Sequence, residues 1–84
     1  MNWTVVWLPK AENRLAELGT NATDRNAVRD AADRIDQLLQ HDPVNQGESR
    51  GGRLRILFER PLAAYFTVDH QSRVVSVTRV WRFS

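Results

Sequence analysis

Cysteine is absent from this chain of 84 residues, and lysine occurs once, at Lys10. Without cysteine, neither disulfides nor thiolate metal ligands can stabilise the fold. No run approaches the ~18 apolar residues of a membrane span, and no signal peptide opens the chain. We therefore expect a soluble, cytoplasmic protein without membrane association. Residues 1–84 should form one small domain, whose thin margin of stability depends on its core or on a bound partner.

Charge is divided unevenly along the chain. Residues 1–49 hold five Lys or Arg and eight Asp or Glu, a net charge of −3. Residues 50–84 hold seven Arg and two Asp or Glu, a net charge of +5. The arginine guanidinium binds phosphate through two hydrogen bonds and stacks on bases, and lysine does both less well. A high-GC genome would also explain the shortage of lysine, but not the segregation of charge, which indicates a polyanionic or acidic partner.

Two helices are predicted in the first half. Residues 3–8 are rich in β-branched and aromatic residues and predict a strand. Pro9 then begins a short helix that Gly19 closes as a C′ residue. The second helix has apolar residues at i, i+3, i+4 spacing, begins after possible N-caps at 21–24, and stops before Asp42.

Three strands are predicted in the second half, after a polar loop over residues 43–52. Short turns separate them, so they should form an antiparallel meander. They cover residues 53–58, 62–68 and 73–82. The order β-α-α-β-β-β predicts an α+β fold in which both helices pack on one face of a small, mainly antiparallel four-stranded sheet.

Alternation along the strands assigns their side chains to two faces. The set expected to meet the helices is Leu54, Ile56, Phe58, Leu62, Ala64, Phe66, Val68, Val75, Val77 and Trp81. The opposite, polar and basic set is Arg53, Arg55, Tyr65, Thr67, Ser76, Thr78 and Arg82, interrupted by Leu57, Ala63, Val74 and Val80. Arg79 shares parity with the apolar set, so it should lie near a sheet edge, or the register shifts by one residue there.

The basic face is the strongest candidate site. Arg53 and Arg55 should lie ~6.5 Å apart, close to the ~6–7 Å phosphate spacing of a nucleic-acid strand. Arg82, anchored by Trp81 and Phe83 against the helices, should join them to clamp phosphates and stabilise charge at a scissile phosphorus. The residues expected to assist in RNA binding are Arg50, Arg60 and Tyr65, the last by stacking on a base. Alternatively, the arginines only keep an exposed sheet face polar.

No metal site or other cofactor is expected. His41 and His70 are both predicted in turns, with no second histidine or cysteine nearby, and should be exposed polar residues. The chain has no motif for Ser/His/Asp or Cys/His catalysis. The glycines of residues 47–52 precede a strand rather than a helix, so they do not form a phosphate-binding loop of the nucleotide-binding type.

These pieces, in this order, resemble the RelE/ParE superfamily of small bacterial toxins from type II toxin–antitoxin modules, often labelled plasmid-stabilisation proteins. The resemblance covers nearly the full length and includes an opening strand that runs into a proline. The residues that carry it are 5–11, 35–39, Asp42-Pro43, 47–50, 53–58, Pro61-Leu62 and 74–81.

The resemblance implies a toxin that inhibits translation as a metal-independent, ribosome-associated mRNA endonuclease. Arg53 and Arg55 match the basic pair on the second strand of the cleaving members, and Arg82 matches the basic residue after the last strand. The RNA 2′-OH would be the attacking group, so no protein nucleophile is needed. Several cleaving members carry a C-terminal tyrosine, but here Arg82 is followed by Phe83 and Ser84. The group that would transfer the proton stays open.

Two alternatives remain. ParE-like members poison DNA gyrase without being enzymes; the missing tyrosine favours this reading, and the retained arginine pair disfavours it. A degenerate member would bind its antitoxin but would not be toxic. All these readings imply a cognate antitoxin that wraps the toxin with an extended segment and an acidic or amphipathic helix. Trp3, Trp7 and Trp81 are expected in the core, and any one left partly exposed would mark a groove for a partner.

Overall fold

The computed structural model describes residues 2–84, which form two α-helices, a 3₁₀ helix and five strands. In chain order the elements are β1 (Thr4–Trp7), α1 (Pro9–Asn21), α2 (Arg25–His41), η1 (Pro43–Asn45), β2 (Glu48–Ser49), β3 (Arg55–Glu59), β4 (Leu62–Asp69) and β5 (Val74–Arg82). No helix in the described part of the chain is long and apolar enough to cross a membrane.

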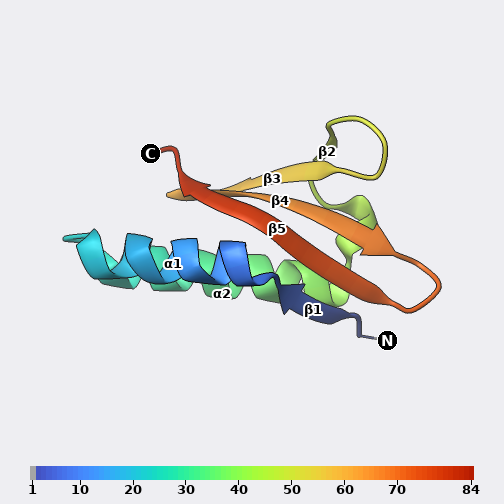
Figure 1. Ribbon diagram of the computed structural model, residues 1–84, viewed down its shortest axis with the longest axis horizontal. Helices are drawn as coiled ribbons and strands as arrows, with labels where there is room; N and C mark the ends of the chain where they lie inside the picture. Colours follow the sequence, from blue (N-terminus) through green and yellow to red (C-terminus); the bar gives the residue numbers. More distant parts are fainter. Residues whose placement is uncertain (1) are drawn as a thin grey trace.

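The strands form one sheet in the order β1-β5-β4-β3-β2, and Figure 1 shows both helices on the same face of it. β3, β4 and β5 form an antiparallel meander, and β1 pairs in parallel with β5. The predicted α+β architecture is confirmed. The predicted number of strands is wrong by one, because Glu48 and Ser49 pair with β3 as the short strand β2. Two residues are too few to produce an alternating pattern.

The core lies between the helices and the sheet, and Phe66, Ile35 and Leu39 are among its largest fully buried side chains. Its buried members are Ala11, Val28, Ala31, Ala32, Ile35, Leu39, Leu57, Leu62, Ala64, Phe66, Val75, Val77 and Val80. At its margin the Trp7 indole Nε1 donates a hydrogen bond to the Asp36 carboxylate, 3.2 Å away. Leu62, Ala64 and Phe66 are all in this core, so the helix-facing side of β4 is as predicted.

The predicted faces of β3 are wrong by one residue. Leu57 lies in the core opposite Ala64, so Arg55 is on the helix side of the strand. Ile56 and Phe58 lie on the open face, where Ile56 is buried and Phe58 is 52% exposed. Apolar residues occur at both parities of this strand, so alternation alone could not decide which set meets the helices.

A β-bulge changes the faces of β5. Phe66 pairs with Val77, and Tyr65 pairs with Arg79, which leaves Thr78 as an extra residue. The Thr78 hydroxyl donates a hydrogen bond to the Tyr65 carbonyl oxygen, 3.4 Å away. Both explanations offered for Arg79 hold, because the register shifts just before it and β5 has no partner strand on the β1 side beyond Val77 within residues 2–84.

Beyond the bulge, alternation resumes in the opposite phase. Val80 is buried in the core, whereas Trp81 lies on the open face beside Tyr65, with ring centroids 5.0 Å apart. The predictions that placed Val80 on the polar face and Trp81 against the helices are therefore wrong. Trp3 and Trp7 do pack against the core, each partly exposed.

The helix boundaries are largely as predicted. α2 ends at His41, directly before Asp42 and Pro43. α1 begins at Pro9 but continues through Gly19 to Asn21, so Gly19 is not a C′ residue. Two further helical residues follow the glycine because nothing in residues 20–21 breaks the helix.

Candidate functional site

A polar hollow of about 480 Å³ lies where the β2–β3 and β4–β5 turns meet. We call it the arginine hollow, because it contains the two arginines that the sequence marked first. Its lining residues are Val44, Ser49, Gly52, Arg53, Arg55, Val68, Asp69, His70 and Gln71. Arg53 and Arg55 are thus brought together as predicted, but at the end of the sheet rather than across its open face.

Arg55 is held in one orientation. Its Nε and Nη2 donate to the Gln46 carbonyl oxygen at 3.0 and 2.8 Å, and Nη2 also donates to the Gly47 carbonyl oxygen at 3.1 Å. Nη1 makes no hydrogen bond to residues 2–84. The guanidinium therefore closes the loop before β2 while it keeps one donor group for a ligand.

Arg53 is exposed and makes no hydrogen bond or ion pair within the described chain. The nearby Asp69 carboxylate accepts hydrogen bonds from the Gln71 and Ser72 N–H groups at 3.0 and 3.3 Å. Hydrogen bonds from Ser72 are the main cause that lowers the pKa of Asp69, and the positive charge of Arg53 adds to it. Asp69 is therefore ionised at neutral pH, and the Arg53 fork remains available to an anion.

Arg82 lies elsewhere, and the prediction that it projects beside Arg53 and Arg55 is wrong. Its two terminal nitrogens each donate to one Asp24 carboxylate oxygen at 2.7 Å, and its Nε donates to the Ser84 carbonyl oxygen at 2.7 Å. Along β4, Arg82 pairs with Leu62 and Arg55 with Phe66, a separation of about 13 Å.

Asp24 is the residue that precedes α2, yet its side chain caps no helix N–H. The bidentate pair with Arg82 takes its place and ties the start of α2 to the end of β5. The predicted anchor is also different, because Phe83 does not turn to the helices. Its N–H donates to the Pro61 carbonyl oxygen at 3.0 Å, and its ring meets Phe58 on the open face at 5.2 Å.

Replacing Asp24 by asparagine should remove a pH-dependent contribution to the free energy of unfolding. Hydrogen bonds from Arg82 lower the pKa of Asp24 below 3.8. The pKa of Asp24 is lower in the folded state than in the unfolded state. The ion pair with Arg82 therefore stabilises the fold above pH 3.8, and this contribution is lost as the pH falls through the pKa of the folded state. In urea unfolding, the advantage of the wild type over D24N should shrink from neutral pH to well below 3.8. An advantage that is constant with pH would contradict this.

The three residues expected to assist in RNA binding are dispersed. Arg50 lies in the β2–β3 turn, 3.4 Å from the Glu48 carboxylate. Arg60 lies in the β3–β4 turn, with its guanidinium 6.0 Å from the centre of the Phe83 ring. Tyr65 lies on the open face beside Trp81. None of them lines the arginine hollow.

The open face of the sheet is aromatic where a basic face was expected. β3, β4 and β5 each contribute one ring to it, and the chain after β5 contributes another. Phe58 and Phe83 are 52% and 42% exposed, and Tyr65 and Trp81 are partly exposed. We define the aromatic face as Phe58, Tyr65, Trp81 and Phe83. Exposed apolar groups gathered in this way are typical of surfaces that bind a partner.

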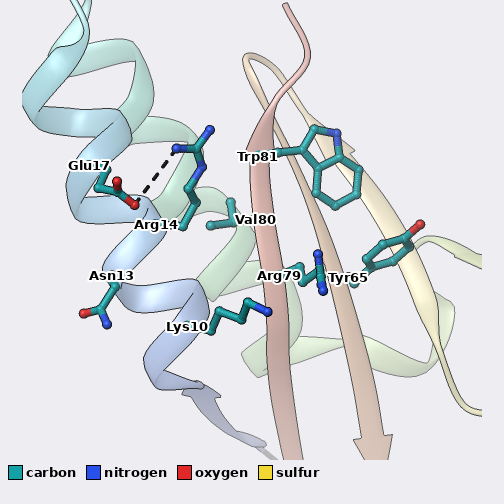
Figure 2. A pocket seen from close by; sticks show the side chains of 8 residues that line it. All are labelled: Lys10, Asn13, Arg14, Glu17, Tyr65, Arg79, Val80 and Trp81. Atoms are coloured by element: carbon teal, nitrogen blue, oxygen red, sulfur yellow. Dashed lines mark ion pairs between the residues drawn. The ribbon is translucent and has the colours of Figure 1, made fainter.

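A cleft of about 600 Å³ adjoins this face at the edge of β5. Figure 2 shows Lys10, Arg14 and Glu17 on α1, across the cleft from β5. The Trp81 ring projects from β5 on the side away from α1, toward Tyr65 of β4. Arg14 and Glu17 are 4.0 Å apart. β1 pairs with β5 only over Val74–Val77, so the rest of β5 has no strand beside it on this side within residues 2–84.

Sequence reasoning missed both the aromatic face and the place of His70. His70 and His41 are exposed as predicted, but His70 lines the arginine hollow. Arg53 and His70 are 17 positions apart with no spacing signal, and only the pairing of β3 with β4 brings them together. No group of three or more His, Cys, Asp or Glu placed to hold a metal ion occurs within residues 2–84.

Solved structures that share this fold include toxins and toxin–antitoxin complexes. No protein-family model and no curated protein matches the sequence. A chain of the Mycobacterium tuberculosis toxin–antitoxin complex RelBE2 aligns over 99% of this chain and 93% of its own, with a TM-score of 0.82 and 14% identity. The chromosomal ParDE system of P. aeruginosa aligns over 98% and 97%, with a TM-score of 0.76 and 23% identity. The isolated RelE toxin of E. coli aligns over 98% and 85%, with a TM-score of 0.69 and 15% identity.

Two helices on one face of a mixed sheet, with the order β-α-α-β-β-β-β once the short β2 is counted, define the class of this protein as α+β. Within that class the chain has the RelE/ParE fold, as its resemblance to that superfamily implied. At 14–23% identity the likeness is one of fold.

Proposed function

We propose that this protein is the toxin component of a type II toxin–antitoxin module and that it acts in the cytoplasm as a metal-independent, ribosome-associated mRNA endonuclease. The fold supports the toxin assignment, because its structural relatives belong to toxin–antitoxin systems. Residues 1–84 constitute its single toxin domain in this proposal.

The observation that carries the endonuclease proposal is the arginine hollow. Arg53 offers a free guanidinium, and Arg55 offers Nη1 from a side chain that is already held by two carbonyl oxygens. Two guanidinium groups in one hollow can bind a phosphodiester and stabilise the charge that develops on it. Arg82, Arg60 and Tyr65 lie outside the hollow, so this proposal gives Arg82 a structural role in place of a catalytic one.

Expression in a growing bacterium, followed by primer extension on a reporter mRNA, tests the proposal. Growth arrest with new 5′ ends inside the translated region is expected. Growth arrest with intact mRNA, an induced SOS response and stalled supercoiling would contradict it. Unimpaired growth would point to a degenerate member that has lost toxicity.

The second candidate is a toxin that inhibits a target protein, such as DNA gyrase, by binding alone. The aromatic face favours it, since aromatic groups rather than cations cover the open sheet where phosphate clamps were expected. The SOS and supercoiling readouts of the same experiment separate this candidate from RNA cleavage.

A cognate antitoxin is the proposed protein partner in either case. The aromatic face supplies apolar contacts, and the cleft beside it has the free edge of β5 and the cations Lys10, Arg14 and Arg79. An extended, acidic segment would pair with the strand edge and balance these charges.

Replacing Trp81 by alanine should weaken antitoxin binding by at least about 2 kcal/mol, roughly 30-fold in Kd. Trp81 lies at the border of the aromatic face and the cleft, so it would be central in an interface that covers both. The measurement is calorimetric titration with the protein encoded beside this gene. Val44→Ala, which removes an apolar side chain 46% exposed near the arginine hollow, is the matched control. Equal affinity for wild type and W81A would place the antitoxin elsewhere.

A further inference from the structure

The endonuclease proposal leaves one chemical role unfilled. Attack of a 2′-OH on phosphorus requires a group that accepts its proton, and arginine is a poor acceptor because its guanidinium stays protonated. Arg53 and Arg55 can bind the phosphate but cannot act as the base. Tyr65 lies on the open face, outside the hollow that holds both arginines.

His70 is placed to fill this role. It lies in the β4–β5 turn, is exposed, and lines the arginine hollow together with Arg53 and Arg55. Its ring meets Trp3 edge to face, with centroids 5.6 Å apart and planes at 83°. This contact restricts the imidazole while both ring nitrogens remain free of hydrogen bonds to residues 2–84. His41, the other histidine, ends α2 and lines a different hollow.

The charges around His70 are suited to an RNA strand. Asp69 is ionised but bound to backbone N–H groups of its own turn. Arg73 stacks on Trp3, with its guanidinium 4.3 Å from the ring centre, on the same indole that His70 touches. Arg53 and Arg55 line the same hollow as His70, so three cations lie in or beside it, and its one carboxylate, Asp69, is already hydrogen-bonded within its turn. A phosphodiester would therefore be drawn to the place where the imidazole can reach it.

We propose that His70 is the catalytic base of RNA cleavage in the arginine hollow, an inference that rests on the proposed endonuclease function. The neutral imidazole takes the proton of the 2′-OH as the O2′–P bond forms and the P–O5′ bond breaks. The departing 5′-oxygen takes a proton from water, and the imidazolium returns its proton to the solvent. The products are a 2′,3′-cyclic phosphate and a 5′-hydroxyl. Arg53 and Arg55 stabilise the charge on the phosphorus oxygens.

Cleavage of a 5′-labelled reporter mRNA in a translating extract tests the inference. His70→Phe keeps an aromatic edge on Trp3 and removes the proton-accepting nitrogen; it should lower the cleavage rate about 100-fold. His41→Gln, which removes an exposed imidazole far from the hollow, should cleave like the wild type. Thermal melting of each variant checks that the fold is kept.

Two further readouts separate catalysis from structural support. The pH profile of the wild-type rate should differ in shape from that of the residual rate of His70→Phe, because the variant lacks the proton-accepting group. Added imidazole should restore part of the rate in His70→Gly. If the wild type cleaves and His70→Phe cleaves equally well, the inference is wrong while the endonuclease proposal stands. If the wild type does not cleave at all, both fail.

Discussion

Replacing Arg53 by alanine should lower the rate of RNA cleavage by about 10²–10³-fold, the usual effect of removing one donor that stabilises the charge of a transition state. Arg53 has the free guanidinium of the arginine hollow, and its loss leaves the developing phosphate charge to Arg55 alone. The measurement is kcat/KM on the reporter mRNA.

Arg53 is a better test than Arg55, because Arg55 also closes the loop at Gln46 and Gly47. Its removal would alter structure and chemistry together. Arg29→Ala is the control, since Arg29 is exposed on α2 and makes no ion pair within residues 2–84. If R53A and R29A cleave at the same rate, the hollow does not bind the scissile phosphate.

Replacing Gly47 by alanine should reduce the free energy of unfolding by about 2–4 kcal/mol, as left-handed backbone strain and crowding add together. Gly47 has φ +70°, and an added Cβ would collide with the Ile56 carbonyl oxygen and stand 3.2 Å from Cε1 of Phe66. Backbone and a buried ring surround it, so neither neighbour can move freely. Urea unfolding would measure the loss. Cleavage should also fall, because the Gly47 carbonyl helps to hold Arg55.

Two other glycines separate these causes. Gly52 also has positive φ, +55°, but has no neighbour within 4 Å of an added Cβ, so Gly52→Ala should cost about 1 kcal/mol from strain alone. Gly19 lies inside α1 with the same open space, and Gly19→Ala should instead stabilise the fold by about 0.5–1 kcal/mol. If G47A were no more destabilised than G52A, crowding would not be a cause.

The sequence was sufficient for the order of the helices and the longer strands, though not for β2. It was also sufficient for the helix-facing side of β4, because apolar residues occupy every second position from Leu62 to Val68. In β3 it was not sufficient. Ile56, Leu57 and Phe58 are consecutive apolar residues, and the strand contacts the core on one side and carries the aromatic face on the other. Which set meets the helices depends on the pairing with β4, since Leu57 lies opposite Ala64.

Only part of the candidate site was predicted, because the rest of it also depends on how the strands pair. Arg53 and Arg55 are close in the chain, so local geometry kept them together. Arg82 depends on the phase of β5 after Thr78, and the bulge turned it toward Asp24. The contact of His70 with the arginine hollow joins two turns that only the sheet brings together, and no local pattern records it.

The extra residue at Thr78 also bears on how chains of this fold can be compared by sequence. Its presence inverts the inside–outside order of every later position in β5, so Val80 and Arg82 fall on the inner side. A relative without a bulge at that point would need the opposite order to build the same core. If the two chains were aligned without a gap, buried positions of one would be matched with exposed positions of the other from the bulge to the end of the strand. Matching such chains at their C-terminal strand therefore requires a one-residue gap placed at the bulge.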